Sequence, residues 1–270
     1  MVKASSVGKT KQPKIDFEKL NRWNGIAIVV FLLEAVALVV AATGRSFPVV
    51  LDFLGLDTLA TQAKGEDVFA AATHRLFDVS LVWVLVLSLL ASAVAYFLVA
   101  SYLRHFYEQG LAKRINSVRW VAYGVSSGLM IVALGLLLGV QSLAALLLLF
   151  TLAFGMGGLY TITEKYGEKA QSAATCTYWI ATVAGIASWL ALALYALGAH
   201  VYGANVPLYL SAASAVAFLL QATISVNFYL QLHAKAKWAD YMYGERGFLV
   251  ANFAMQSVVA WIIFAGSLRP

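Results

Sequence analysis

The sequence predicts an all-α fold, a bundle of seven transmembrane helices, and three observations support this fold class. Hydrophobic residues make up 61% of the 270 residues, and the mean hydropathy is +0.79. Uncharged or nearly uncharged apolar runs of about twenty residues, long enough to cross a bilayer as helices, recur along the chain. A soluble domain of this length would not carry so many of them. We therefore expect one integral membrane domain over residues 1–270.

Composition also excludes several classes of function. A single cysteine, Cys176, excludes a disulfide framework within the chain and a cysteine-rich metal site. The four histidines lie far apart in the sequence and lack metal-ligand spacing. The net charge of +6 reflects basic loops that face anionic lipid, so it does not require a nucleic-acid partner. We predict neither a metal ion nor an enzymatic activity.

The chain begins with a polar, basic segment, residues 1–24, which we expect to be a cytoplasmic tail. A signal peptide is the alternative, but the apolar run Gly25–Ala42 is longer than an ordinary signal-peptide core. We expect a retained first helix at about Gly25–Thr43, with Glu34 at its middle. Residues 44–75 then form a long extracellular loop with four acidic residues, and its length predicts that it has structure of its own.

Six further apolar runs follow, each separated from the next by charged, glycine-containing or proline-containing segments. The last run carries no charge, and Asn252 and Gln256 lie on one face of it because they are four residues apart. The six helices are expected at about Leu76–Leu103, Val118–Leu138, Ser142–Thr163, Thr175–Leu197, Pro207–Leu232 and Gly247–Leu268.

Loop charges predict the orientation. The tail and the loops that follow the second, fourth and sixth helices carry fifteen Lys and Arg residues, against four on the other side. The positive-inside rule then places the N-terminus in the cytoplasm and the C-terminus outside a plasma or bacterial inner membrane. Seven-helix receptors and ordinary rhodopsins have the opposite orientation.

Four motifs resemble those of the heliorhodopsins. RWVAYGVSSGLMI (119–131) is similar to the family's third-helix motif, which usually reads RWVEYS-x-SSS-x-MI, and EKY (164–166) is similar to the end of its fourth helix. KWADYMYGERG (237–247) resembles the cytoplasmic loop before its seventh helix, and SVVAWIIFAGSL (257–268) resembles the end of that helix. The resemblance implies an inverted seven-helix bundle, a homodimer, and light sensing through retinal instead of pumping.

The differences from the family motifs fall at the retinal chemistry. The resemblance places the family's retinal-binding lysine at Gln256, its counterion glutamate at Ala122 and a cavity histidine at Ala95. No lysine follows Lys237, and an imine requires a primary amine. The counterion balances a buried protonated imine, so the loss of both residues is physically coherent. We therefore expect no covalent retinal and no other covalent cofactor.

Other positions that line retinal in the family are partly kept. Met156, Trp179 and Trp189 match such positions, whereas Gln221 replaces a phenylalanine and Asn252 replaces a serine. The predicted ligand-binding residues are Ala122, Ser126, Met156, Trp179, Trp189, Gln221, Asn252 and Gln256. The occupant would be a reversibly bound apolar molecule or lipid. The alternative is an amide network that only connects helices.

These observations leave three functions open. The first is a sensor with an empty or reversibly occupied pocket, membrane lipids around it and a cytoplasmic signalling partner. The second is a transporter or ion-conducting protein that uses Glu34 and the amides of Gln221, Asn252 and Gln256; Glu34 could instead be a protonated acid bonded to a neighbouring helix. The third is a photoreceptor that binds retinal without a covalent bond. The run 124–128 has the spacing of a hydrolase nucleophile elbow, but its helical context predicts close packing instead.

Overall fold

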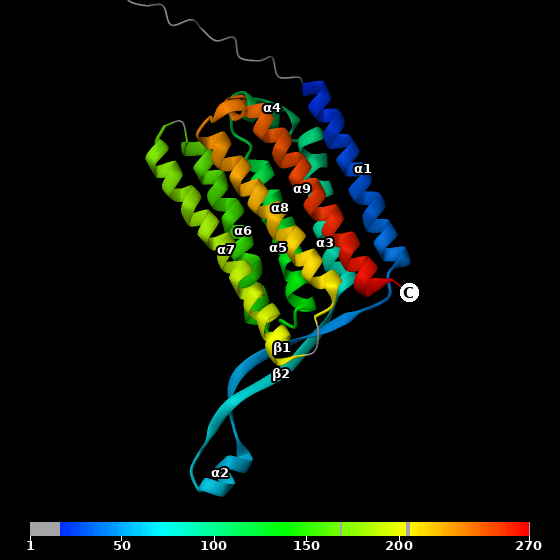
Figure 1. The fold of residues 1–270 in the computed structure, drawn as a ribbon, viewed down its shortest axis with the longest axis vertical. Coiled ribbons are helices and arrows are strands. Elements are labelled where there is room, and N and C mark those ends of the chain that lie inside the picture. The colour runs from blue at the N-terminus through cyan, green and yellow to red at the C-terminus, as the bar shows by residue number, and fades with distance from the viewer. Residues whose placement is uncertain (1–16, 168, 204–205, 270) are drawn as a thin grey trace, which may run out of the picture.

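The structure is a computed structural model that describes residues 17–167, 169–203 and 206–269 (Figure 1). Within these residues seven helices are long and apolar enough to cross a membrane. They are α1 (Phe17–Ala41), α3 (Leu81–Ala100), α5 (Ser117–Leu137), α6 (Leu143–Tyr166), α7 (Gln171–Tyr202), α8 (Leu208–Leu232) and α9 (Tyr241–Ile263), which continues as a π-helix, η2 (Phe264–Leu268). The predicted seven-helix bundle is confirmed.

The two ends of the bundle differ. A short amphipathic helix, α4 (Arg104–Ala112), lies at one end, which we call the α4 end (Figure 1). It buries Tyr107 and Leu111 against the bundle. Opposite lies the hairpin end, where strands β1 (Ser46–Leu56) and β2 (Phe69–Ser80) leave the bundle.

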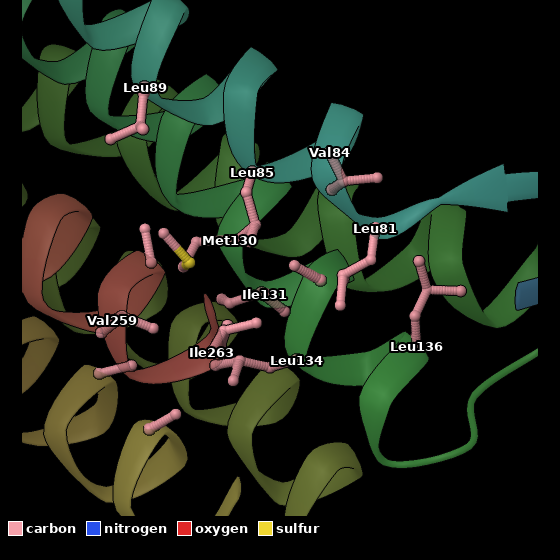
Figure 2. Close-up of a cluster of buried hydrophobic side chains, with 14 of the residues drawn as sticks. Leu81, Val84, Leu85, Leu89, Met130, Ile131, Leu134, Leu136, Val259 and Ile263 are labelled. Carbon is pink, nitrogen blue, oxygen red and sulfur yellow. The ribbon is translucent and has the colours of Figure 1, made fainter. Parts of the chain in front are cut away.

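The bundle has an aliphatic core and an aromatic core. The aliphatic core joins α1, α3, α5 and α9 and includes Leu81, Leu85, Leu134 and Ile263 (Figure 2). Nearer the α4 end, Trp120 packs against Tyr160, Phe228 and Phe248, with ring centroids 4.5–5.3 Å apart. Aromatic rings therefore surround the segment of α5 that follows its first turn.

Helices α5 and α6 approach closely because glycines face each other at their contact. A Cβ on Gly124 would lie 3.0 Å from the carbonyl oxygen of Phe154, and one on Gly157 would collide with the carbonyl oxygen of Trp120. Gly128 faces the ring of Phe150, 2.8 Å from such a Cβ. This confirms that the run 124–128 serves packing, as its helical context predicts.

The long loop after α1 has secondary structure of its own, as its length predicts. Strands β1 and β2 pair antiparallel from Ser46↔Ser80 to Leu56↔Phe69, and α2 (Thr58–Lys64) joins them. Helix α3 therefore begins at Leu81, and the prediction of a start at Leu76 is wrong. The apolar residues before Leu81 fit a helical run equally well, but the ladder to β1 takes their backbone hydrogen bonds.

Other helix boundaries also differ from the predictions. Helix α1 begins at Phe17, so part of the predicted tail is helical, and residues 1–16 of that tail lie outside the described residues. Helix α9 begins at Tyr241 instead of at the predicted Gly247. Asp240 caps this start by accepting a hydrogen bond from the Met242 amide at 3.0 Å. Polar first turns of this kind extend a helix beyond its apolar run.

Candidate functional site

Gln256 lies at the centre of the bundle, where its side chain contacts α3. Its side chain is on α9 and is 0% exposed. The Ser88 hydroxyl of α3 lies 2.6 Å from Gln256 Oε1 and 2.7 Å from the carbonyl oxygen of Ser126 on α5. Gln256 Nε2 has no hydrogen-bond partner among the described residues. The amide therefore bonds α9 to α3, the Ser126 carbonyl oxygen of α5 competes for the same Ser88 proton, and Gln256 Nε2 stays open.

A polar cavity of about 40 Å³ lies on the α4 side of this contact. Three of the predicted ligand-binding residues line it, namely Ala122, Ser126 and Asn252, and so does Ala95. Asn252 Nδ2 donates to the Tyr96 hydroxyl at 3.3 Å. The volume suffices for about two or three water molecules, since one needs at least about 10–15 Å³.

Open polar groups surround the polar cavity. Four buried atoms of its lining have no partner within the described part of the chain, and three of the four are donors or hydroxyls. They are Ser92 Oγ, Arg119 Nε, Tyr123 OH and Asn252 Oδ1. Burial also raises the pKa of Tyr107, another lining residue, well above its usual value, so its hydroxyl keeps its proton. Because unpaired buried polar groups are costly, this cavity is built for polar contents.

A buried ionic cluster closes the polar cavity towards the α4 end. It consists of Asn116, Arg119, Glu164, Tyr241 and Glu245. Arg119 contacts Glu164 at 2.6 Å and Glu245 at 2.5 Å. The Asn116 backbone amide donates to Glu164 at 2.7 Å, the Asn116 side chain donates to Glu245 at 2.5 Å, and the Tyr241 hydroxyl donates to Glu164 at 2.8 Å. The cluster joins α5, α6 and α9.

Sequence reasoning missed this cluster. Arg119 was counted with the loop charges that predict orientation, but it is buried in α5 and paired with two acids. The count becomes fourteen against four without it, so the asymmetry remains. A usable signal was present, because Arg119, Glu164 and Glu245 each stand inside one of the motifs shared with the heliorhodopsins, and charges inside apolar helices need partners.

Met156 and Gln221 lie together at a different place. Both are buried, and Gln221 Nε2 is 3.9 Å from Met156 Sδ. They fill the space beside Gly185 of α7, where a Cβ would meet the methionine sulfur. Gln221 Oε1 has no partner among the described side chains and backbone. Neither residue lines the polar cavity.

The two tryptophans of α7 do not share one site. Trp189 lines an apolar cavity of about 500 Å³ between α7 and α8, together with Leu192, Leu210, Ser214 and Phe218. Trp179 is 52% exposed on the outside of the bundle, where it contacts Tyr178 and Tyr229. The prediction that the eight residues share one pocket is therefore wrong. Ten residues separate the tryptophans, which turns them about 80° apart around a helix of 3.6 residues per turn.

Glu34 lies half-buried on α1, and its carboxylate faces α9. The Ser257 hydroxyl donates to its Oε2 at 2.9 Å, and Trp261 Nε1 donates to its Oε1 at 3.2 Å. It does not line the polar cavity. This geometry matches the interpretation of Glu34 as an acid bonded to a neighbouring helix.

Comparison with known proteins agrees with this architecture. No curated protein matches the sequence. The family model described as Heliorhodopsin matches residues 20–268, which include all seven membrane-spanning helices apart from the first turn of α1. The resemblance of the four motifs is thereby confirmed, and the chain is a multi-pass membrane protein that belongs to the heliorhodopsin family.

Proposed function

We propose that this chain is a non-pumping sensor of the heliorhodopsin family that forms no Schiff base with retinal. One observation carries the proposal: the resemblance places the retinal lysine at Gln256, and α9 contains no lysine at all. An amide cannot form an imine. The buried contact of Gln256 with Ser88 supports this, since it uses the central position for helix packing.

Adding all-trans retinal to the purified protein tests the proposal. We expect no red-shifted visible band and no adduct after borohydride reduction. A red-shifted band with a reducible adduct would contradict the proposal. A retinal-like band that washes out and is not reducible would instead identify a photoreceptor that binds retinal without a covalent bond.

Restoring the missing groups sharpens the test. Gln256→Lys supplies the amine, and Ala122→Glu adds a carboxylate at the wall of the adjoining polar cavity. We expect the double variant to form a pigment with a higher imine pKa than Gln256→Lys alone, because a nearby carboxylate stabilises the protonated imine. Gln256→Arg is the matched control, since it adds charge without a primary amine. Equal imine pKa values in the single and double variants would exclude Ala122 as the counterion position.

The apolar cavity supports reversible binding of a lipid-like molecule with one hydrogen-bond acceptor. Its lining includes Trp189 Nε1 and Ser214 Oγ, two buried groups without partners in the described structure. Lipid is the surrounding solvent at this depth, and an acceptor on the ligand would satisfy the indole N–H. We expect Trp189→Phe to lower the amount of lipid that copurifies, measured by mass spectrometry. Gln256→Leu is the control, because Gln256 does not line this cavity.

The orientation follows from the loop charges. The α4 end carries most Lys and Arg residues, which favours placing this end in the cytoplasm and the C-terminus outside the cell. A cytoplasmic partner would then bind near Lys235 and Lys237. Labelling of a C-terminal tag with a membrane-impermeant reagent should succeed from outside intact cells. Labelling only after the cells are opened would show that the C-terminus is cytoplasmic and would contradict this orientation.

The exposed hairpin supports a homodimer as part of this proposal. Two-stranded sheets are marginal alone, yet Phe53, Leu54, Phe69 and Phe77 are exposed on this one. A second copy of the chain is the occupant that the family resemblance supports. We expect Phe53→Ser with Leu54→Asn to lower the dimer fraction in light scattering of the detergent-solubilised protein. An unchanged dimer would place the interface on the helices.

A further inference from the structure

A cavity of about 320 Å³ lies at the α4 end, and of its lining residues only Lys235 enters the function proposed above. Segments that are distant in the sequence meet around it: the turn after α4, the end of α6, the start of α7 and the residues after α8. We call it the basic cavity. The lining residues that matter here are Arg114, Glu164, Gln231, His233 and Lys235.

Positive charge dominates this lining. Neither Arg114 nor Lys235 forms an ion pair among the described residues. His233 adds an imidazole whose Nδ1 lies 3.0 Å from the Tyr229 carbonyl oxygen and whose Nε2 lies 3.4 Å from Thr175 Oγ1. Among the described lining residues the acid is Glu164, and both of its oxygens are occupied by the ionic cluster. An anion that entered would meet unpaired cations and a neutralised carboxylate.

Arg114 occupies a backbone position that normally selects glycine. Its φ is 57°, and it follows the end of α4 as a left-handed cap. The Arg114 amide bonds the Leu111 carbonyl at 3.0 Å, and the Ile115 amide bonds the Gly110 carbonyl at 2.9 Å. Glycine fits such a cap without strain, whereas a residue with a Cβ is disfavoured there. The fold thus keeps a strained arginine at the wall of the basic cavity.

Gln231 adds an open acceptor. Its side chain belongs to a residue that is 9% exposed, and its Nε2 donates to the Tyr241 carbonyl at 2.9 Å. Its Oε1 has no partner in the described part of the molecule. An acceptor beside two cations fits a ligand that carries both negative oxygens and an O–H group.

We propose that the basic cavity binds a phosphomonoester. Arg114 and Lys235 would contact the phosphate oxygens, since guanidinium and ammonium groups form strong charge-assisted bonds with phosphate. The remaining O–H of the phosphate monoanion would donate to Gln231 Oε1. The cavity lies at the ends of membrane-spanning helices, so the phosphate could belong to a lipid headgroup or to a soluble metabolite.

Two probes separate these sources. The full chain is purified and titrated with glycerol 3-phosphate by calorimetry, and it is reconstituted in phosphatidylcholine nanodiscs that contain either phosphatidic acid or phosphatidylglycerol at equal mole fraction. Phosphatidic acid has a phosphomonoester headgroup, whereas phosphatidylglycerol has a phosphodiester. Native mass spectrometry counts the lipids that stay bound.

The variants are Arg114→Gly and Lys235→Gln, with Lys113→Gln as the matched control. Lys113 is exposed, as Arg114 is, but Lys113 does not line the cavity. Arg114→Gly removes the charge and also relieves the strained cap, so reduced binding would not reflect unfolding. We expect each cavity variant to weaken phosphomonoester binding by about tenfold or more, and the control to change it less than about twofold.

Each outcome decides the proposal. If Arg114→Gly weakens binding of both glycerol 3-phosphate and phosphatidic acid, the site is open to soluble phosphomonoesters. If Arg114→Gly weakens binding of phosphatidic acid but not of glycerol 3-phosphate, the site is a headgroup site. Equal retention of phosphatidylglycerol and phosphatidic acid would show general attraction to anionic lipid and would overturn the proposal. The same follows if Lys113→Gln weakens binding as much as Arg114→Gly, or if the unaltered chain binds neither probe.

Discussion

The carboxylates of the ionic cluster and the amides near the bundle centre are both buried and polar, but their hydrogen bonds are satisfied to different degrees. In the ionic cluster all four carboxylate oxygens of Glu164 and Glu245 have partners. Each of the amides of Gln221, Asn252 and Gln256 leaves one atom without a partner in the described structure. The cluster connects three helices, whereas the amides adjoin spaces or well-packed side chains.

The difference shows where the fold requires a hydrogen-bond partner for each polar atom and where it tolerates an atom without one. A buried charge without a partner is strongly destabilising, so the cluster tolerates little change. A neutral amide with one open group costs less, and a water molecule or ligand atom can satisfy it. Substitution is therefore easier at the amides than at the cluster.

Removing the arginine of the cluster should have the largest effect. Arg119→Met leaves Glu164 and Glu245 buried and unpaired, and we expect a loss of about 3–5 kcal/mol in unfolding free energy. Unfolding in detergent micelles measures it. The control is Arg246→Met, which breaks the exposed pair with Asp240 at 3.5 Å and should cost about 0–1 kcal/mol. Similar losses in both variants would contradict the distinction between the two regions.

The α5–α6 contact that aligns Arg119 with Glu164 comes next. Gly157→Ala would force a methyl group against the Trp120 carbonyl oxygen, and we expect a loss of about 1–3 kcal/mol, as for other overpacked sites. The adjacent Gly158→Ala is the matched control, because nothing lies within 4 Å of its added Cβ. The same unfolding measurement applies. A tolerated Gly157→Ala would mean that the helices separate without disturbing the cluster.

The central amide should be less sensitive than the cluster despite equal burial. Gln256→Leu removes one acceptor of the Ser88 hydroxyl. The hydroxyl can still donate to its other acceptor, the Ser126 carbonyl oxygen at 2.7 Å. Replacing a partly satisfied amide by an apolar group of similar size should change the unfolding free energy by less than about 1 kcal/mol. Ser88→Ala in the Gln256→Leu background separates the two partners. A loss as large as that of Arg119→Met would show that Gln256 is an essential structural residue.

Glu34 should give the smallest effect. Glu34→Gln retains an oxygen that can accept from Ser257 or Trp261, so we expect an unfolding free energy changed by less than about 1 kcal/mol. Proton flux into liposomes, followed with a pH-sensitive dye, should be absent in both the unaltered chain and the variant. A flux that disappears with Glu34→Gln would favour the transporter hypothesis and contradict the proposed sensor.

The sequence by itself determined the number of membrane-spanning helices and the family. A long apolar run that crosses lipid forms a helix, because its backbone N–H and C=O groups must then bond within the run itself. The motifs around Arg119, Glu164 and Trp261 identified the family, and the absence of a lysine in the last helix is a property of the sequence alone. These features depend on local composition and spacing.

Only the tertiary structure decided which side chains meet. It paired Arg119 with two glutamates from other helices, divided the eight predicted ligand-binding residues among separate places, and turned the predicted start of α3 into the end of a strand. Helix rotation and cross-strand pairing set these contacts, and both depend on packing between segments far apart in the chain. The hydropathy of one helix does not determine which of its faces points to which neighbour.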